Sequence, residues 1–354
     1  MTDRPRISDV ARLAGTSVST VSNLLNGRAH RMRPETMARI EEAIEGLGYR
    51  PSWAARQLKT GFVPVLGLLV PSVANPFHGA LARAVEEAAQ ARGFQVLLGN
   101  SLRDPVRERR YAEEFLRFGI RGIIAGSSPL DLEHFADLVG RGLHIVAFDR
   151  RLGDGGRGEP AIDSVSMDND QAGYLATRHL IGLGHRRIGY ITGATPTASR
   201  RDRLAGYRRA LAEAGLPADA ALVAGEPASR GFDDTNAAEH GRAGALALLR
   251  LAEPPTALVA LNDMHAIGAC AAVRECGGRV PGDVSVVGID DIVIGQFVDP
   301  PLTTVRQPLD RLAAAAVERL IQRIHGGAGE PPADELFAAE LVVRGSSAAP
   351  GGRG

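Results

Sequence analysis

Short apolar runs alternate with helical segments along most of this chain, and this alternation limits the folds that it can adopt. The clearest runs are residues 65–70, 94–98, 188–191, 257–261 and 284–289. Strand-like apolar runs separated by helices are typical of parallel sheets whose strands are joined by crossover helices. The sequence therefore predicts an α/β core built on parallel sheets.

The length of 354 residues allows two or three domains, each with its own core. The longest apolar run, 63–70, already contains Pro64 and Gly67 and is far shorter than the roughly 20 residues that a membrane span needs. The first residues are polar and show no signal peptide. Two cysteines are too few for a disulfide framework. We therefore expect a cytoplasmic protein with no membrane partner.

The start of the chain has the pattern of a helix-turn-helix. Ser8 and Ser17 are each placed to cap a helix, because a serine hydroxyl can accept from the first free backbone amides. Ala11, Gly15 and Val21 supply a small residue where two helices cross, a glycine for the turn, and a branched apolar residue beneath the second helix. A generic helical hairpin is the alternative.

A third helix is predicted from Pro34 to Leu47, because apolar residues recur there every three to four positions and Gly48 follows. Three short helices form a compact head. The outward face of its second helix carries Val18, Ser19, Ser22 and Asn23. Side chains in such a position can reach base edges in the major groove of DNA.

The net charge of zero conceals an uneven distribution. Residues 1–60 carry nine Arg and Lys59, the only lysine, against six acidic side chains, which gives a net charge of +4. The other residues carry 31 basic and 35 acidic side chains, which gives −4. A basic head on an acidic body indicates a module that binds a polyanion, with chance scatter of charges as the alternative.

No motif indicates catalysis. Lys59 follows a leucine, so the chain has no Gly-Lys phosphate loop. Residues 153–158 fit G-x-G-x-x-G, but a proline and a strand-like stretch follow where the dinucleotide fingerprint needs a helix. Cys270 and Cys276 do not have zinc-ligand spacing, and no G-x-S-x-G elbow is present. We therefore expect no catalytic residue, no metal and no cofactor.

Several sequence blocks resemble one known family. VARLAGTSVSTVSNLLN (10–26), RIEEAIEGLGYRPS (39–52) and AARQL (54–58) resemble the head and hinge of the lactose-repressor (LacI/GalR) family of bacterial transcription regulators. The resemblance continues through the core. Further matching blocks are FDRR (148–151), DNDQAG (168–173), HLIGLGHRRIGYITG (179–193), RLAGYRRAL (203–211), ALNDMHAIGA (260–269), VPGDVSVVGIDD (280–291), PLTTVRQP (301–308) and ELVVRGSS (340–347).

The resemblance implies a ligand-responsive regulator, expected to be a repressor that binds a palindromic operator in double-stranded DNA as a homodimer. The implied parts are a helix-turn-helix head (1–49), a hinge helix (50–60), a two-lobed effector-binding and dimerisation core (61–345) and a disordered tail (346–354). The core resembles type I periplasmic binding proteins. The chain is expected to cross between the lobes near Val165, Thr304 and Pro331. The tail lacks the apolar heptads of tetrameric relatives, which favours a dimer.

For DNA contact, the resemblance points to Ser17, Val18, Ser19, Thr20, Ser22 and Asn23 in the head and to Ala55, Leu58 and Lys59 in the hinge. Leu58 matches a leucine that wedges into the minor groove and kinks the duplex, ordinary packing being the alternative. Ala55 matches the small residue that lets two hinge helices pack closely. Asn23 stands where many relatives have Arg, and we therefore expect an altered operator half-site.

For the effector, Arg203, Asn262 and Asp290 match residues that contact ligand hydroxyls. Weaker candidates are Ser199, Asp149, Phe77 and His78. Planar, multidentate polar groups of this kind suit a sugar or another polyol. A purine or nucleoside effector is the main alternative, and a solute-binding protein without DNA function is a more distant one.

Overall fold

The chain divides into two units, residues 1–63 and 64–354, which are called the head and the core here. The computed structural model describes residues 5–25, 29, 32–49, 63–152, 160, 162–193, 196–225, 236–326 and 331–351. The predicted hinge at 50–60 lies outside the described residues. No helix in the described part of the chain is both long enough and apolar enough to span a membrane.

The head consists of α1 (Ile7–Leu13), α2 (Val18–Leu25) and α3 (Pro34–Leu47). Its small core has Val10, Ala11, Ala14, Val21, Ile40 and Ala43 at the centre. Gly15 and Gly48 both adopt the left-handed conformation, with φ of 60° and 59°. Glycine reaches this conformation without strain, so it can close the turn after α1 and end α3. The predicted helix-turn-helix and third helix are therefore confirmed.

The two expected serine caps have different outcomes. The Ser17 hydroxyl accepts a hydrogen bond from the Thr20 amide at 3.1 Å, at the start of α2. The cap expected at Ser8 is wrong, because α1 already begins at Ile7. There Arg6 is the N-cap residue, and the carboxylate of Asp9 accepts from its backbone N–H at 2.8 Å.

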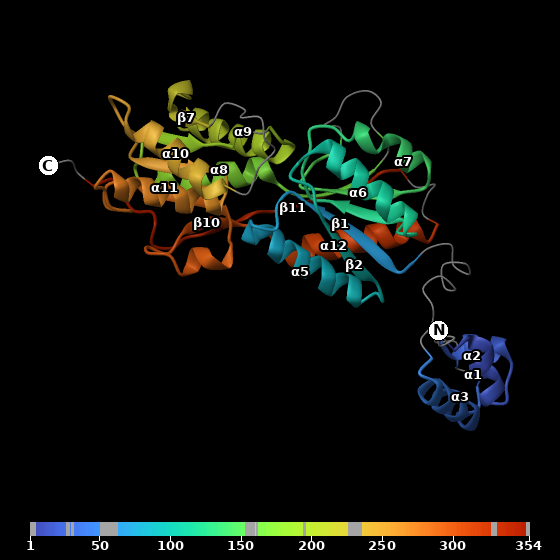
Figure 1. The fold of residues 1–354 in the computed structure, drawn as a ribbon. Coiled ribbons are helices and arrows are strands. Elements are labelled where there is room, and N and C mark those ends of the chain that lie inside the picture. The colour runs from blue at the N-terminus through green and yellow to red at the C-terminus, as the bar shows by residue number, and fades with distance from the viewer. Residues whose placement is uncertain are drawn as a thin grey trace. The chain divides into compact units, whose positions relative to one another are not determined.

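The core contains two lobes, each built on a six-stranded sheet (Figure 1). The strands of lobe 1 are β1 (Val65–Val70), β2 (Gln95–Asn100), β3 (Gly122–Ala125), β4 (His144–Phe148), β5 (Asp163–Met167) and β11 (Asp334–Phe337). The strands of lobe 2 are β6 (Ile188–Ile191), β7 (Val223–Ala224), β8 (Ala257–Ala260), β9 (Ser285–Asp290), β10 (Thr303–Arg306) and β12 (Glu340–Val342). The predicted strand runs are confirmed, with β2 and β9 displaced by one to two residues and β8 one residue shorter.

Helices connect the strands in both lobes. Lobe 1 contains α5 (Pro76–Gln90), α6 (Pro105–Arg117), η1 (Glu133–Phe135), α7 (Ala136–Gly140) and α12 (Leu309–Ile324). Lobe 2 contains α8 (Asn169–Gly182), α9 (Ala198–Glu213), η2 (Ala220–Leu222), α10 (Ala237–Leu249), α11 (Asp263–Glu275) and η3 (Val293–Gln296). In lobe 1, α5 packs against α12; in lobe 2, α8 packs against α9 and α10 against α11.

Both sheets have the same doubly wound order. Lobe 1 runs β11-β5-β4-β3-β1-β2, and lobe 2 runs β12-β10-β9-β8-β6-β7. All the pairings are parallel except the one between β10 and β12. Strand order reverses beside β1 and beside β6, and folds of this class bind ligands at such a point, outside the carboxyl ends of the strands.

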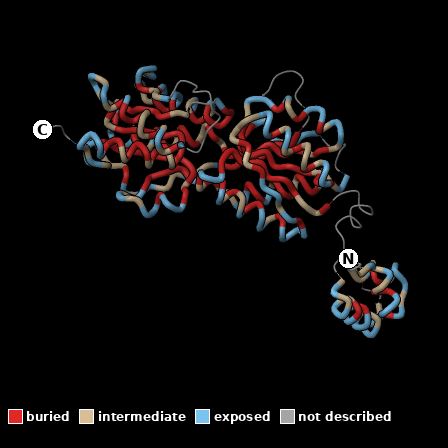
Figure 2. Tube along the Cα trace, in the orientation of Figure 1, coloured by how far each residue is buried: buried red, intermediate tan, exposed pale blue. Residues whose placement is uncertain are grey.

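Burial is concentrated in the strands of the two lobes (Figure 2). In β1, the side chains of Leu66, Leu68, Leu69 and Val70 are completely buried. Gly67 in the same strand has no side chain because the ring of Phe115 on α6 occupies the space; a Cβ atom there would lie 2.6 Å from that ring. Such runs, apolar on both faces, are what a sheet covered by helices requires.

The chain passes between the lobes three times. The crossings lie at Asp168, at 307–308 and at 338–339, between elements that belong to different sheets. The first two are within a few residues of the expected positions, Val165 and Thr304. The crossing expected near Pro331 is wrong, because β11 first adds a strand to lobe 1 by pairing with β5.

The disorder expected for 346–354 is wrong for its first residues. Ser346 is completely buried. Its hydroxyl donates to the carbonyl of Val286 at 2.6 Å and accepts from the amide of Thr303 at 2.8 Å. The carbonyl of Ala348 accepts from the buried ring of His185 at 2.9 Å. This segment is ordered because lobe 2 offers it polar partners; residues 352–354 lie outside the described residues.

Candidate effector cavity and DNA-binding surface

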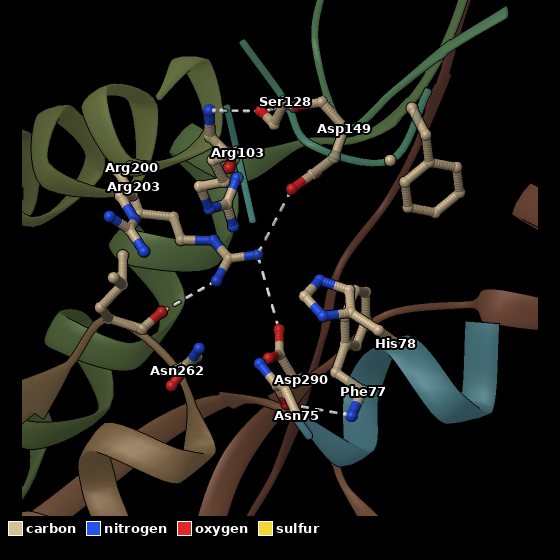
Figure 3. A pocket seen from close by; sticks show the side chains of 14 residues that line it. Asn75, Phe77, His78, Arg103, Ser128, Asp149, Arg200, Arg203, Asn262 and Asp290 are labelled. Atoms are coloured by element: carbon tan, nitrogen blue, oxygen red, sulfur yellow. Dashed lines mark hydrogen bonds and ion pairs between the residues drawn. The ribbon is translucent and has the colours of Figure 1, made fainter. Parts of the chain in front are cut away.

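A small cavity lies between the lobes, at the carboxyl ends of their strands (Figure 3). Lobe 1 contributes Asn75, Phe77, His78, Arg103, Gly126, Ser128, Phe148 and Asp149. Lobe 2 contributes Ser199, Arg200, Arg203, Leu261, Asn262 and Asp290. All seven residues that the sequence nominated for the effector line this one cavity.

Arg203, in α9, is the centre of the polar network. Its Nε donates to Oδ1 of Asn169 at 2.8 Å and its Nη1 donates to the carbonyl of Leu261 at 2.8 Å. Its Nη2 lies 3.7 Å from Asp149 of lobe 1 and 3.6 Å from Asp290 of lobe 2 (Figure 3). A single guanidinium therefore links the two lobes inside the cavity.

Two glycines bring Arg203 to this place. A Cβ atom on Gly173 in α8 would lie 1.9 Å from the backbone carbonyl oxygen of Arg203. A Cβ atom on Gly206 in α9 would lie 1.9 Å from the carbonyl oxygen of Asp170. The two helices therefore approach each other backbone to backbone, which only glycine permits. The contact fixes the depth at which Arg203 enters the cavity.

Asp290 ends strand β9 and has an unusual environment. Its Oδ1 accepts from the side-chain amide of Gln307 at 2.8 Å. Burial raises the pKa of Asp290 to about 8; the carboxylates of Asp263 and Asp149 act in the same direction, whereas Arg203 and Gln307 oppose them. A protonated carboxyl can donate a hydrogen bond as well as accept one, which widens the range of ligand groups that it can contact.

Backbone strain gathers around the cavity. Arg103, Ser128, Asp149 and Asp290 have φ values between 51° and 128°, where residues other than glycine are uncommon. Asp149 is fixed there by its partners: the Asn169 amide donates to its carboxylate at 2.5 Å, and its backbone amide donates to the carbonyl of Val165 at 2.9 Å. Residues held in such conformations often belong to ligand sites.

Asn262 both caps a helix and faces the cavity. Its Oδ1 accepts from the amide of His265 at 3.0 Å and contacts the Nδ1 of the same residue at 2.7 Å, at the start of α11. Its amide nitrogen has no hydrogen-bond partner among the described residues and lines the cavity. The cap holds this donor in position for a ligand.

The walls of the cavity combine apolar and polar surfaces. Phe77 and His78 begin α5, with their rings 5.4 Å apart and nearly perpendicular. The Nδ1 of His78 lies 2.9 Å from the carbonyl of Ser72, which fixes the ring. Phe148 and Leu261 add apolar surface. Aromatic walls with a few fixed polar groups are typical of small-molecule sites.

Sequence reasoning missed half of the lining. The residues that it did not nominate are Asn75, Arg103, Gly126, Ser128, Phe148, Arg200 and Leu261. The predicted strands could have identified some of these residues. Asn75, Arg103 and Ser128 each follow the carboxyl end of a strand by three to five residues. Arg200 lies three positions before Arg203 and therefore on the same side of α9.

The titration of Asp290 gives a prediction about stability. Its pKa is raised from 3.8, so between about pH 4 and pH 8 the folded state binds a proton that the unfolded state has released. Stability should therefore fall as pH rises through this window, by up to about 1.4 kcal/mol per pH unit from this group. Asp290→Asn cannot titrate, so the difference between wild type and variant in urea unfolding should change across the window. Parallel pH profiles of the two proteins would contradict the prediction.

The head presents the expected surface on α2. Val18, Ser19 and Asn23 are exposed and Ser22 is half-buried, whereas Val21 on the opposite side is completely buried. The hydroxyl of Ser17 lies 2.7 Å from that of Ser19 and 2.8 Å from that of Thr20. The start of α2 therefore presents a row of hydroxyl groups and one apolar side chain. Ala55, Leu58 and Lys59 lie outside the described residues.

Comparisons with known proteins decide the family. The model for bacterial regulatory proteins of the lacI family matches residues 6–52, and the model for the periplasmic binding protein-like domain matches residues 177–347. The transcriptional regulator GalR of Salmonella typhimurium (strain LT2) is 35% identical over 347 residues, which cover 97% of this chain and 96% of GalR. The chain belongs to the LacI family.

Two solved structures of transcription regulators extend the comparison. A lac repressor dimer bound to operator and the anti-inducer ONPF is 27% identical, with a TM-score of 0.80 over 98% of this chain and 100% of that chain. A complex of the regulator CelR with cellobiose is 31% identical, with a TM-score of 0.70 over 97% of this chain and 100% of that chain. Both similarities extend over almost the whole chain, head and core included.

This LacI-family protein is therefore a DNA-binding, ligand-responsive transcriptional repressor and not an enzyme. Its small-molecule partner is an effector rather than a cofactor, and operator DNA is its macromolecular partner, bound by dimers in this family. Within the described residues, no group of three or more His, Cys, Asp or Glu side chains could hold a metal ion.

Proposed function

We propose that the chain is a homodimeric repressor of a palindromic operator and that its effector is a sugar or related polyol in the inter-lobe cavity. One observation carries the proposal: the cavity gathers seven residues that the sequence spreads from Phe77 to Asp290. Its lining combines carboxyl, amide, hydroxyl and guanidinium groups with the aromatic rings of Phe77 and Phe148. A polyol needs this arrangement, because each of its hydroxyls both donates and accepts.

A ligand can change the arrangement of the two lobes relative to each other, because polar groups of both lobes meet at the cavity. Arg203 approaches Asp149 across the cavity, and the Ser128 hydroxyl of lobe 1 accepts from the amide of Ser199 in lobe 2 at 3.1 Å. A ligand that bonds groups of both lobes stabilises the closed arrangement over an open one. Differential affinity for the two arrangements is what couples effector binding to the operator.

The similarity to the CelR complex supports a carbohydrate, since that regulator holds cellobiose. We assign the direct contacts of the operator to Val18, Ser19, Ser22 and Asn23 on α2, with Ser17 and Thr20 at its start. Ala55, Leu58 and Lys59 are proposed as the hinge contacts. Because its target is operator DNA, we place the dimer in the cytoplasm, at the nucleoid.

Selection of binding sites from random duplex DNA tests the DNA part of the proposal. We expect a palindromic consensus, whose affinity falls steeply with salt because bound arginines displace counterions from phosphates. Absence of site-specific binding, with or without candidate ligands, contradicts it. A thermal-shift screen of sugars and nucleosides tests the effector class. A ligand at about 100 times its Kd adds about 2.7 kcal/mol of stability; a nucleoside as the strongest stabiliser contradicts a polyol effector.

Asn23→Arg should change the operator at one position of each half-site. Asn23 is exposed on α2, and an asparagine side chain can bond N6 and N7 of adenine, whereas arginine prefers O6 and N7 of guanine. The expected shift in preference is about 1–3 kcal/mol at that base. Site selection with both proteins measures it. Identical consensus sequences would show that Asn23 does not read a base.

A further inference from the structure

We propose that Ser128 of lobe 1 is a latch that holds the two lobes closed before any effector binds, by capping the first turn of α9 in lobe 2. The inference goes beyond the proposed function, because it concerns the effector-free protein and applies to any class of effector. Ser128 follows β3 by three residues and borders the cavity, and α9 begins at Ala198 in the other lobe.

The start of α9 needs acceptors from outside the helix. The first amides of any helix have no partner within it. Thr197, the N-cap residue, serves two of them: its hydroxyl accepts from the amide of Arg200 at 3.3 Å, and its carbonyl accepts from the amide of Arg201 at 3.0 Å. The amides of Ala198 and Ser199 remain. Both residues are more than nine-tenths buried, where an unpaired amide is costly.

Ser128 supplies both of the missing acceptors. Its backbone carbonyl accepts from the amide of Ala198 at 3.1 Å, and its hydroxyl accepts from the amide of Ser199 at 3.1 Å (Figure 3). The same hydroxyl donates its proton to the carbonyl of Asp149 at 2.5 Å, so its oxygen presents lone pairs to α9. One residue of lobe 1 therefore completes the N-terminus of a helix that belongs to lobe 2.

Two other helices that begin at the cavity do not depend on the opposite lobe in this way. Asn75 accepts from the amide of Phe77 at the start of α5, and Asn262 accepts from the amide of His265 at the start of α11. Each cap comes from the residue that immediately precedes its own helix. Separation of the lobes leaves both of these caps in place, whereas it removes the acceptors of the first two amides of α9.

Ser128 adopts an unusual backbone conformation at this contact. Its φ is 51°, in the left-handed region where residues other than glycine are uncommon, and it is buried. Such conformations persist where surrounding contacts fix them. Asp149, with a φ of 60°, also contacts lobe 2, since its carboxylate accepts from the side-chain amide of Asn169 at 2.5 Å. These contacts join the lobes through protein groups alone.

A latch of this kind lowers what the effector has to supply. A ligand that binds only the closed arrangement has an apparent affinity that is reduced in proportion to the fraction of closed protein. Each hydrogen bond of the latch shifts the balance between closed and open protein by about 2–10-fold toward the closed side. We therefore expect the effector-free protein to be mostly closed, with its cavity already assembled.

Ser128→Ala and Ala198→Pro each remove one of the two bonds. Ser128→Ala removes the hydroxyl. Ala198→Pro removes the amide that donates to the Ser128 carbonyl and places a ring carbon there. Proline is favoured at the first position of a helix, and Thr197 before it has the extended conformation that proline requires, with φ of −137° and ψ of 163°. Ser127→Ala is the matched control, because Ser127 is equally buried and its hydroxyl has no hydrogen-bond partner among the described residues.

Hydrogen–deuterium exchange of the full-length, effector-free protein measures the latch, with mass spectrometry that resolves single amides. We expect slow exchange of the Ala198 and Ser199 amides in the wild type. The Ser199 amide should exchange about 2–10-fold faster in Ser128→Ala and at least as fast in Ala198→Pro. Ser127→Ala should exchange like the wild type.

Pulsed electron paramagnetic resonance adds the distance between the lobes. One spin label is attached to the exposed Cys276 of lobe 2 and one to Arg110→Cys on α6 of lobe 1, where Arg110 is exposed. Labelled protein is mixed with an excess of unlabelled protein, so that only distances within one subunit are measured. We expect a single distance without the latch substitutions and a second population of distances when Ser128→Ala is added.

Three results overturn the inference: fast exchange of both amides in the wild type, equal exchange in the wild type and Ser128→Ala, or the same acceleration in Ser127→Ala. Faster exchange with a single, unchanged distance between the labels also overturns it, because the helix end then frays while the lobes stay closed. Ser128→Ala gives the answer even if Ala198→Pro does not fold. None of these results depends on the identity of the effector or the operator.

Discussion

Arg203→Met should lower the free energy of unfolding by about 3–5 kcal/mol and abolish effector binding. Arg203 is 5% exposed, and its guanidinium is the cation that faces both Asp149 and Asp290. Methionine fills much of the same volume but leaves two buried carboxyl groups without a cation and the Leu261 carbonyl without its donor. The loss of charge compensation, rather than a loss of packing, dominates the effect.

Urea unfolding and effector titration measure the two consequences separately. Arg209→Met is the matched control, because Arg209 lies on the same helix but pairs with Asp170 at an exposed position; we expect a change of at most about 1 kcal/mol. Adding Asp149→Asn and Asp290→Asn to Arg203→Met should recover part of the stability without restoring binding. A single Arg203→Met variant with wild-type stability would mean that the two carboxyl groups do not need this cation.

Gly173→Ala should be the second large effect. One methyl group there meets the backbone carbonyl of Arg203 at 1.9 Å, and no flexible side chain can yield to relieve the overlap. The helices α8 and α9 must separate, which we expect to cost about 3 kcal/mol or more, at the upper end of overpacking effects. Because the displaced atom belongs to Arg203, the effector site should be lost as well.

Gly182→Ala is the control for this experiment. Gly182 ends the same helix, and a Cβ atom there meets no atom within 4 Å. Alanine in a helix is about 0.5–1 kcal/mol more favourable than glycine, so this variant should be slightly more stable than the wild type. The melting temperatures of the two variants measure the effects separately: Gly173→Ala reports the cost of the close helix contact, and Gly182→Ala reports helix propensity alone. Equal melting temperatures would show that α8 and α9 can separate at little cost.

Local signals explain what was predictable from the sequence. In the head, Ser17, Gly15 and Gly48 determine the beginnings and ends of helices through bonds within a few residues, and these features were predicted correctly. The error at Ser8 also has a local cause, since the helix begins two residues earlier at its N-cap Arg6, whose amide donates to Asp9. The parallel sheets were predicted from continuous apolar runs. Strands of a parallel sheet are buried on both faces, so their sequences are apolar throughout and do not alternate with polar residues.

Long-range partners explain what was missed. Ser346 looks like part of a flexible end, but Val286 and Thr303 supply its hydrogen bonds from positions more than 40 residues away. The third crossing was misplaced because β11 is short and half-exposed, and only its pairing with β5 makes it a strand. Arg103 and Arg200 lie at a strand end and a helix start, where no periodicity shows which side chains face a ligand.

The late strands β11 and β12 have a consequence for biosynthesis. Residues 334–342 complete the edges of both sheets, so neither lobe has all its strands until the ribosome has released almost the entire core. The head has its own buried core, whose residues lie between Val10 and Ala43 and are therefore all made early in translation. During translation a nascent chain can therefore display a folded DNA reader well before it possesses the sensor that controls it.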